Sequence, residues 1–226
     1  MLHSDNIPVL LLTGYLGSGK TTLLNRILSN RKGIRFAVIV NDIGEVNIDA
    51  ELIQKGGVVA QQDDSLIALQ NGCICCSLKM DLVQQLRDLC ATNQFDYIVI
   101  EASGICEPAP IAQTISSYPS MVPASSAPIP VLDAIVSVVD ALRLRDEFMV
   151  QLSSISNNSL PIAKAEDLAS LVIEQIEFCN LILLNKVSEV NEEERKQIIS
   201  IIRAIQPKAQ IIECDYCDVP FGEILD

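Results

Sequence analysis

A glycine-rich segment near the N-terminus has the residue types and spacing that bind phosphate groups. Residues Gly14–Thr21 read GYLGSGKT and satisfy GxxxxGK[ST], between an expected strand at Pro8–Thr13 and a helix expected to begin near Lys20. Glycine lets consecutive backbone N–H groups converge on phosphate oxygens, and the helix N-terminus adds positive potential. We expect Lys20 to contact the outer phosphates and Thr21 to ligate Mg²⁺. The residues assigned to this nucleotide site are Gly14, Gly17, Ser18, Gly19, Lys20, Thr21 and Thr22.

An acidic residue closes a later apolar run. Residues Tyr97–Glu101 read YIVIE, which indicates a buried strand that delivers the Glu101 carboxylate at its carboxyl end, where α/β sheets bind ligands. We expect Glu101 to orient the Mg²⁺ shell or the attacking water, and Gly104, in the following turn, to present its N–H to the terminal phosphate. The alternative is a carboxylate that only caps the next turn. Lys20, Glu101 and Gly104 are therefore the candidate catalytic residues.

A base-recognition motif is nearly complete further along the chain. Residues Asn185–Ser188 read NKVS, close to the NKxD signature in which the aspartate accepts two hydrogen bonds from guanine. Ser188 offers one hydroxyl, so discrimination against adenine is weakened unless Glu189 supplies the carboxylate. We assign Asn185, Lys186 and Ser188 to the nucleotide site and expect guanine to be favoured. We expect Ser188 to occupy the base-reading position, since Glu189 is displaced by one residue, so that Ser188→Asp tightens GTP binding. If Glu189 reads the base instead, the same change weakens GTP binding.

Three cysteines fall within four positions. Cys73, Cys75 and Cys76, in the segment GCICC, can converge as thiolates on one soft or borderline cation such as Zn²⁺ or Cu⁺. The alternative is a set of small buried side chains near a turn. The only histidine is His3, near the N-terminus, so we expect the fourth ligand to be Glu45, from the acidic segment Asn41–Asp49. That segment has its own alternative as a solvated acidic loop.

The other cysteines give weaker signals. Cys90 and Cys179 stand on apolar periodic faces and are expected in the core. Cys214 and Cys217 form a CxxC, which indicates either a second metal contact or no function.

Apolar runs of strand length alternate with helix-period segments along the chain, which is typical of an α/β protein with a mostly parallel sheet. We expect a helix around Leu82–Cys90, and another that begins after Asn191 as N-cap, with Glu194 completing a capping box. Two stretches interrupt the pattern: Pro119–Pro130 is expected to be a surface connection, and Gln151–Lys164 a mobile loop. The prediction is one domain over residues 1–226. The expected strands are Pro8–Thr13, Arg35–Val40, Tyr97–Ile100, Ile135–Val139 and Leu181–Leu184.

The composition excludes several classes of protein. The 226 residues carry 29 acidic and 16 basic side chains, a formal net charge of −13, so nucleic acid and anionic membranes are not expected partners. The mean hydropathy is +0.33, yet every apolar run is shorter than the roughly 18 residues of a spanning helix. No basic residue precedes the first apolar run, so we expect no secretory signal and a cytoplasmic protein with reduced thiols.

The ordered motifs resemble those of the CobW-type metal-chaperone GTPases, which are relatives of the nickel-insertion GTPases of urease and hydrogenase maturation. The most specific is the CxCC motif. In order, the motifs are GYLGSGKTTLLN (Gly14–Asn25), NDIGEVNID (Asn41–Asp49), GCICC (Gly72–Cys76), EASGICEP (Glu101–Pro108), VVDA (Val138–Ala141) and EQIEFCNLILLNK (Glu174–Lys186).

The resemblance implies a three-layer P-loop GTPase domain that couples GTP hydrolysis to delivery of Zn²⁺ or a related transition metal to a client metalloprotein, with nucleotide-dependent homodimers. Ser188 departs from the family's usual aspartate, and the smaller C-terminal CobW-type domain is absent from the chain. Two alternatives stay open. One is an ATP-using P-loop kinase or synthetase, and the other is a metal-buffering protein without turnover.

Overall fold

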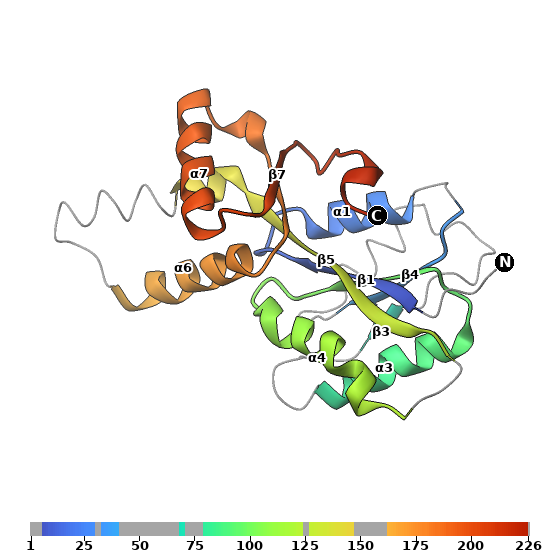
Figure 1. The fold of residues 1–226 in the computed structure, drawn as a ribbon. Helices are drawn as coiled ribbons and strands as arrows, with labels where there is room; N and C mark the ends of the chain where they lie inside the picture. The colour runs from blue at the N-terminus through green and yellow to red at the C-terminus, as the bar shows by residue number, and fades with distance from the viewer. Residues whose placement is uncertain are drawn as a thin grey trace.

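The chain folds around one parallel sheet with helices on both faces (Figure 1). The computed structural model describes residues 6–29, 33–40, 68–70, 79–123, 127–146 and 162–225, with the backbone alone for 68–70 and 162–169. The seven described strands are all parallel, in the order β3-β2-β4-β1-β5-β6-β7. They are β1 (Asn6–Thr13), β2 (Phe36–Val40), β3 (Ala68–Gln70), β4 (Tyr97–Glu101), β5 (Ile129–Asp140), β6 (Leu181–Asn185) and β7 (Gln210–Glu213).

The helices confirm the expected α/β class and its three layers. Side chains of α3 and α4 pack on one face of the central strands, while α1 and the segment near the C-terminus pack on the other (Figure 1). Helices α6 and α7 share a third apolar cluster with β6. The helices are α1 (Lys20–Leu28), α3 (Lys79–Thr92), α4 (Pro108–Met121), α6 (Ile162–Glu177) and α7 (Glu192–Ile205), with 3₁₀ turns η1 (Val187–Glu189) and η2 (Phe221–Glu223) and helical residues 141–146.

Burial of both sheet faces explains why the strands read as continuous apolar runs. In β1, Leu10 and Leu12 pack in the cluster that holds α1, whereas Val9 and Leu11 pack against α3 and α4. A parallel strand covered by helices on both sides needs apolar residues at every position. The five expected strands are therefore all found, with ends shifted by a few residues except in β5, which begins six residues earlier than expected.

Two expected connections were partly wrong. Helix α4 continues to Met121 with Pro119 in its last turn, and β5 begins at Ile129 and includes Pro130, so Pro119–Pro130 is not wholly a connection. Pro130 is tolerated because, among the described strands, this half of β5 pairs with β1 alone; pairing with β6 begins at Val136. Likewise, residues 162–164 are helical, and residues 151–161 lie outside the described part.

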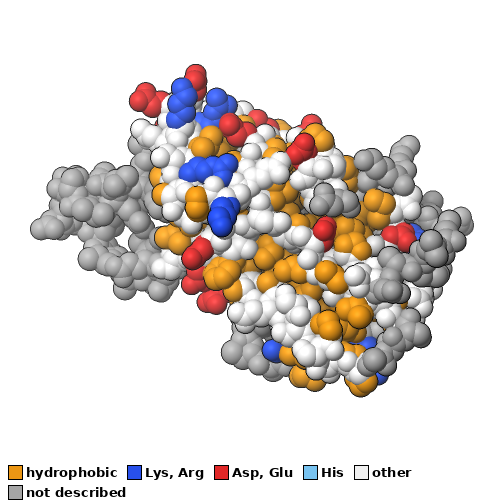
Figure 2. Space-filling view, viewed as in Figure 1, with side chains coloured by type: hydrophobic (Ala, Val, Ile, Leu, Met, Phe, Trp, Pro, Cys, Tyr) orange, Lys and Arg blue, Asp and Glu red, His pale blue; other side chains and the backbone are white. Residues whose placement is uncertain are grey.

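The first half of β5, which has one neighbour among the described strands, carries exposed apolar side chains. Figure 2 shows hydrophobic side chains gathered over β5 and α4, and Ile129 and Val131 of β5 are exposed. Among the described helices, none is long and apolar enough to cross a membrane.

Helix α7 begins as its sequence predicts. The Asn191 side chain accepts hydrogen bonds from the Glu193 and Glu194 N–H groups, and the Glu194 carboxylate accepts from the Asn191 N–H at 2.9 Å. This capping box satisfies N–H groups that the first helical turn would otherwise leave without partners. The predicted N-cap is confirmed, and with it the position of the loop between β6 and α7.

Candidate nucleotide site

The glycine-rich loop follows β1 at the carboxyl edge of the sheet and requires glycine at two positions. Gly14 has φ +138°, and a Cβ there would lie 2.3 Å from the Val138 carbonyl oxygen of β5. Gly19 has φ +117°, and a Cβ there would lie 2.5 Å from Asn185 Nδ2. Both values of φ are unfavourable for residues with a side chain. The loop is thus pressed between β5 and the end of β6.

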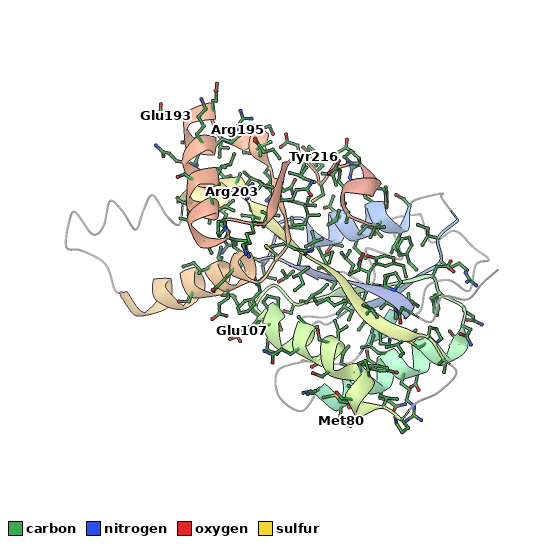
Figure 3. The ribbon with its side chains drawn as sticks, in the orientation of Figure 1. Met80, Glu107, Glu193, Arg195, Arg203 and Tyr216 are labelled. Atoms are coloured by element: carbon green, nitrogen blue, oxygen red, sulfur yellow. The ribbon has the colours of Figure 1, made fainter. Side chains whose placement is uncertain are left out.

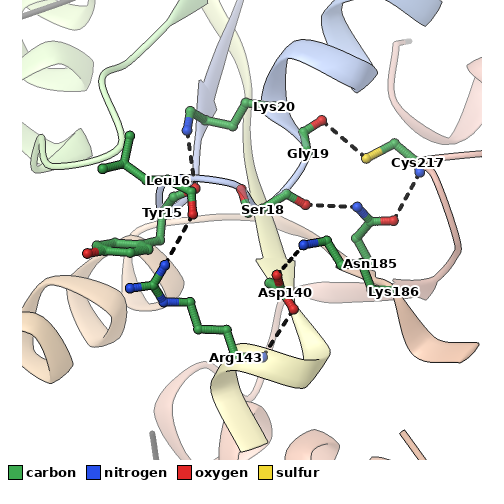
Figure 4. Close-up of polar contacts among 10 residues, drawn as sticks. All are labelled: Tyr15, Leu16, Ser18, Gly19, Lys20, Asp140, Arg143, Asn185, Lys186 and Cys217. Carbon is green, nitrogen blue, oxygen red and sulfur yellow. Dashed lines mark hydrogen bonds and ion pairs between the residues drawn. The ribbon is translucent and has the colours of Figure 1, made fainter. Parts of the chain in front are cut away.

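Lys20 crosses the inside of this loop (Figure 4). Its side chain is 8% exposed, and Nζ donates to the Tyr15 carbonyl oxygen at 3.3 Å. Thr21 is half-buried, while Thr22 and Gly17 are exposed. The expected nucleotide residues of this segment therefore lie together at the junction of β1 and α1, where backbone N–H groups and the helix N-terminus meet.

Buried hydroxyl groups cluster at the same junction. Thr13 Oγ1, Ser18 Oγ and Ser137 Oγ are buried and have no hydrogen-bond partner among the described residues. Thr13 and Ser137 are neighbours in the β1–β5 register. Since buried polar atoms are rarely left unsatisfied, these oxygens indicate a place where a polar ligand belongs.

The carboxyl end of β4 lies beside the loop. Glu101 is buried and pairs in register with Leu12 of β1, whose carbonyl accepts from the Ala102 N–H at 2.8 Å. Gly104 follows, and a Cβ there would lie 2.8 Å from the Leu16 N. Gln175 of α6 donates from Nε2 to the Gly104 carbonyl at 3.1 Å. The structure thus brings the turn after β4 into contact with the glycine-rich loop Gly14–Thr21, which is the phosphate-type loop of this fold.

Asn185 joins the same loop to the base-recognition segment. It is buried; its Nδ2 donates to the Ser18 carbonyl at 2.8 Å, and its Oδ1 accepts from the Cys217 N–H at 3.0 Å (Figure 4). Lys186 has φ +62° and its Nζ forms an ion pair with Asp140 at the end of β5. The segments expected to bind the phosphates and the base are therefore in direct contact.

Ser188 is hydrogen-bonded to the carboxylate of Asp215. Both its N–H and its Oγ hydrogen-bond to Asp215 Oδ1, at 3.1 and 2.9 Å. Glu189, the other candidate for the base-reading carboxylate, is exposed in η1, where its N–H donates to the Lys186 carbonyl. Sequence reasoning did not identify Asp215, although it lies between the two cysteines of the CxxC, because that motif indicated only a metal contact or no function.

Two further residues beside the loop were not predicted. Arg143 lies over the Tyr15 ring, 3.8 Å from its centroid, and its Nη1 donates to the Leu16 carbonyl at 3.4 Å. Asp140 Oδ1 accepts from the Arg143 N–H at 3.1 Å and so begins the helical turn at 141–146. The only sequence signal was the VVDA motif that contains Asp140.

The CxxC pair packs against this site. Cys214 and Cys217 are buried free thiols, and Cys217 Sγ lies 3.4 Å from the Gly19 carbonyl oxygen. The hydrogen bond between the two thiols lowers the pKa of Cys214 and raises that of Cys217. The described residues include no group of three or more potential metal ligands, so they offer these two thiols no further ligand. Cys90 and Cys179 lie in the core, as predicted.

The expected thiol site falls outside the described residues. Cys73, Cys75, Cys76 and Glu45 all lie in 41–67 or 71–78, so this ligand set stays a prediction.

Comparison with known proteins gives consistent matches. The profile of the family described as CobW/HypB/UreG, nucleotide-binding domain, matches residues 8–213. The "Zinc-regulated GTPase metalloprotein activator 1" of Dictyostelium discoideum is 37% identical over 98% of this chain and 48% of its own length. The "Zinc chaperone YjiA" of Escherichia coli is 34% identical over 96% of this chain and 60% of its own.

Solved structures agree with these matches. A Zn(II)-bound triple mutant of the YjiA GTPase superposes with a TM-score of 0.63 at 27% identity, over 98% of this chain and 62% of that one. HypB from Helicobacter pylori, in complex with nickel, has a TM-score of 0.54 at 19% identity over 95% of this chain and 81% of that one, which supports the fold alone. The chain spans about half to three-fifths of the length of the curated relatives it matches.

Proposed function

The chain belongs to the family of CobW/HypB/UreG nucleotide-binding domains, and on that premise we propose that it hydrolyses GTP and couples its nucleotide state to the binding and transfer of zinc or a related transition metal. Relatives named zinc chaperone and zinc-regulated GTPase metalloprotein activator support the proposal. In this proposal the protein that receives the metal is a metalloprotein, and the transfer takes place in the cytoplasm. A nucleotide-dependent homodimer belongs to the same proposal.

The observation that carries the nucleotide part is the buried Asn185 amide. It bonds the Ser18 carbonyl of the phosphate-type loop on one side and the Cys217 N–H on the other. An amide held by two buried hydrogen bonds is fixed in position and orientation. A purine bound next to Lys186 would therefore have its phosphates directed to the glycine-rich loop.

The chemistry follows from the groups at this edge. Lys20 would neutralise charge on the transferred phosphoryl group, and the loop N–H groups would bind its oxygens. Glu101 would orient the attacking water, and the Gly104 N–H would contact the terminal phosphate. Thr21 and Glu101 fit Mg²⁺, which prefers oxygen ligands, and the buried hydroxyls of Thr13 and Ser18, which have no partner among the described residues, support a polar ligand at this edge. When bound, Mg²⁺ would supply charge neutralisation at the phosphates.

Sheet topology supports coupling to metal. Strands β2 and β3 are parallel to β4 and β1, so their carboxyl ends, at Val40 and Gln70, lie on the same edge as the phosphate-type loop. The acidic segment Asn41–Asp49 follows β2, and the CxCC cysteines follow β3 within a few residues. In the proposal, Cys73, Cys75, Cys76 and Glu45 bind the transported ion, and its binding changes nucleotide affinity through the Asn41–Asp49 segment.

One experiment separates this proposal from its alternatives. Hydrolysis of GTP and ATP is measured with and without Zn²⁺, and bound metal is counted in the same sample. We expect GTP turnover that changes with metal load. Preferred ATP turnover would favour the kinase or synthetase alternative, and metal binding without turnover at any load would favour the metal-buffering alternative.

Two variants assign the residues. Lys20→Ala is expected to abolish turnover with the fold intact, whereas Lys79→Ala, at an exposed lysine on α3, keeps it. Cys75→Ala is expected to weaken Zn²⁺ in chelator competition and leave metal-free GTP binding unchanged. Unchanged turnover in the Lys20 variant, or unchanged metal affinity in the Cys75 variant, would contradict the corresponding assignment.

A further inference from the structure

A guanine-reading site needs two acceptor atoms, and residue 188 cannot supply them. The N1–H and 2-amino groups of guanine together bind one carboxylate, and Ser188 has a single hydroxyl oxygen. That hydroxyl is already engaged, since it lies 2.9 Å from Asp215 Oδ1, a carboxylate oxygen that can only accept. The Ser188 N–H donates to the same oxygen at 3.1 Å. Ser188 therefore positions the Asp215 carboxylate through two hydrogen bonds.

We propose that Asp215, in the loop after β7, is the carboxylate that selects guanine in this protein. The proposal rests on the GTP-binding function proposed above. Ser188 binds one oxygen of Asp215, and no described residue donates to the other, Oδ2. The carboxylate of Asp215 is partly exposed and stands directly next to the position at which the NKxD signature has its aspartate. It can thus take over the function of that aspartate from a different segment of the chain.

The loop that carries Asp215 is fixed to the rest of the nucleotide site. Its first residue, Cys214, donates its N–H to the Leu184 carbonyl of β6 at 2.9 Å. Two residues after Asp215, the Cys217 N–H donates to Asn185 and Sγ lies 3.4 Å from the Gly19 carbonyl oxygen. A loop held at β6, Asn185 and the start of α1 keeps its carboxylate in place before the base arrives, which lowers the entropic cost of binding.

Helix α1 adds a further anchor. Arg26 donates from Nε to the Tyr216 carbonyl at 2.8 Å and from Nη1 to Asp218 Oδ1 at 2.7 Å. Tyr216, labelled in Figure 3, lies on the outer side of this loop and is 77% exposed. The backbone of Asp215 is therefore held on both sides by residues that also contact the phosphate-type loop and its helix.

The diagnostic variant is Asp215→Asn, tested with GTP, ATP and xanthosine triphosphate. Xanthine has a carbonyl in place of the guanine 2-amino group, so an amide at 215 can donate to it, whereas a carboxylate cannot. We expect GTP affinity to fall at least about tenfold, the usual effect of an unmet polar partner, and xanthosine triphosphate affinity to rise. ATP affinity should not change. A gain of affinity for one nucleotide cannot result from misfolding.

Glu189→Gln is the matched control, because it removes the same charge one residue after Ser188, and it should leave all three affinities unchanged. Three results would overturn the inference: an unchanged ratio of GTP to xanthosine triphosphate affinity in Asp215→Asn, an equal loss of all three nucleotides, or a loss of guanine preference in Glu189→Gln. Failure of the proposed function is a distinct result, namely wild-type protein that binds no GTP, or Lys20→Ala protein with undiminished turnover.

Discussion

Replacing Gly104 by alanine tests whether the turn after β4 constrains the phosphate-type loop. A methyl group at 104 would lie 2.8 Å from the Leu16 N, 2.9 Å from Leu16 Cγ and 3.0 Å from Leu16 Cδ2. The Leu16 side chain is 56% exposed and can move away, but its backbone nitrogen moves only with the loop. Gly104 is not among the residues with positive φ, so the effect comes from the contact and not from backbone strain.

The size of the effect follows from the geometry. Forcing one extra carbon into a packed contact costs roughly 1–3 kcal/mol. Gly104 cannot retreat freely, because Gln175 holds its carbonyl at 3.1 Å, so the displacement falls on Leu16 and the loop. If about half of the cost, about 1 kcal/mol, appears as lost ligand binding, GTP affinity falls about fivefold, since 1.4 kcal/mol corresponds to one decade. The remainder lowers the free energy of unfolding by about 1 kcal/mol.

The assay is titration of a fluorescent GTP analogue together with urea unfolding. Gly222→Ala is the control, because a Cβ at Gly222 would have no atom within 4 Å, and both readouts should stay at the wild-type values. The double variant Gly104→Ala/Leu16→Ala should recover part of the loss, since it removes the Cγ and Cδ2 contacts but keeps the one with the backbone nitrogen. Wild-type GTP affinity in Gly104→Ala would refute the reasoning.

Two other predictions follow from named contacts. Ser188→Asp should weaken GTP binding, because two carboxylates about 4 Å apart repel by about 1 kcal/mol in water and by more in a less polar site. GTP titration checks this, and the double variant Ser188→Asp/Asp215→Ser should restore the affinity. Tighter GTP binding by the single variant is the opposite sign and would show that residue 188 reads the base. Asp96→Asn should lower the free energy of unfolding by up to about 1 kcal/mol at pH 7, since Arg35 binds both Asp96 oxygens at the half-exposed start of β2 and β4. Hydrogen bonds from Arg35 lower the Asp96 pKa, so this stabilisation is present above the unfolded-state pKa near 4 and is lost as the pH falls through the lower folded-state pKa. In urea unfolding, the difference in unfolding free energy between wild type and Asp96→Asn should be smaller at pH 3 than at pH 7. A difference that does not depend on pH would contradict this prediction.

The sequence predicted those parts of the fold that local pattern determines. Continuous apolar runs identify strands buried on both faces, and the glycine spacing between β1 and α1 fixes the phosphate-type loop. Element ends were less predictable at Pro119 and Pro130. Pro119 removes one hydrogen bond from the last turn of α4, and the helix ends two residues later. Pro130 stands where its missing N–H donor is tolerated, in the half of β5 that pairs with β1 alone among the described strands. Whether such a position exists depends on the neighbouring strand, which the local sequence does not specify.

The residues that sequence reasoning missed act through contacts distant in the chain. Ser188 and Asp215 are 27 residues apart, and Cys217 reaches Gly19 across 198 residues. Gln175 meets Gly104 across 71 residues. No motif of fixed spacing predicts these pairings, because a loop after one strand can reach a neighbouring strand end from many positions. Such contacts are determined by strand order and were visible only in the folded chain.

The position of Asn185 supports the proposal that Asp215 replaces the usual aspartate of the base-reading motif. Its amide bonds the Ser18 carbonyl and the Cys217 N–H, so the phosphate-type loop and the loop after β7 are held on the same buried side chain. Asn185 therefore holds the loop that carries Asp215 close to the glycine-rich loop, where the proposal places the phosphates. Asp215 lies two residues before Cys217 and accepts hydrogen bonds from Ser188, so its carboxylate lies beside position 188, where the NKxD signature has its aspartate. In the proposal, serine in place of aspartate at 188 moves the acceptor to another segment of the chain without moving the base.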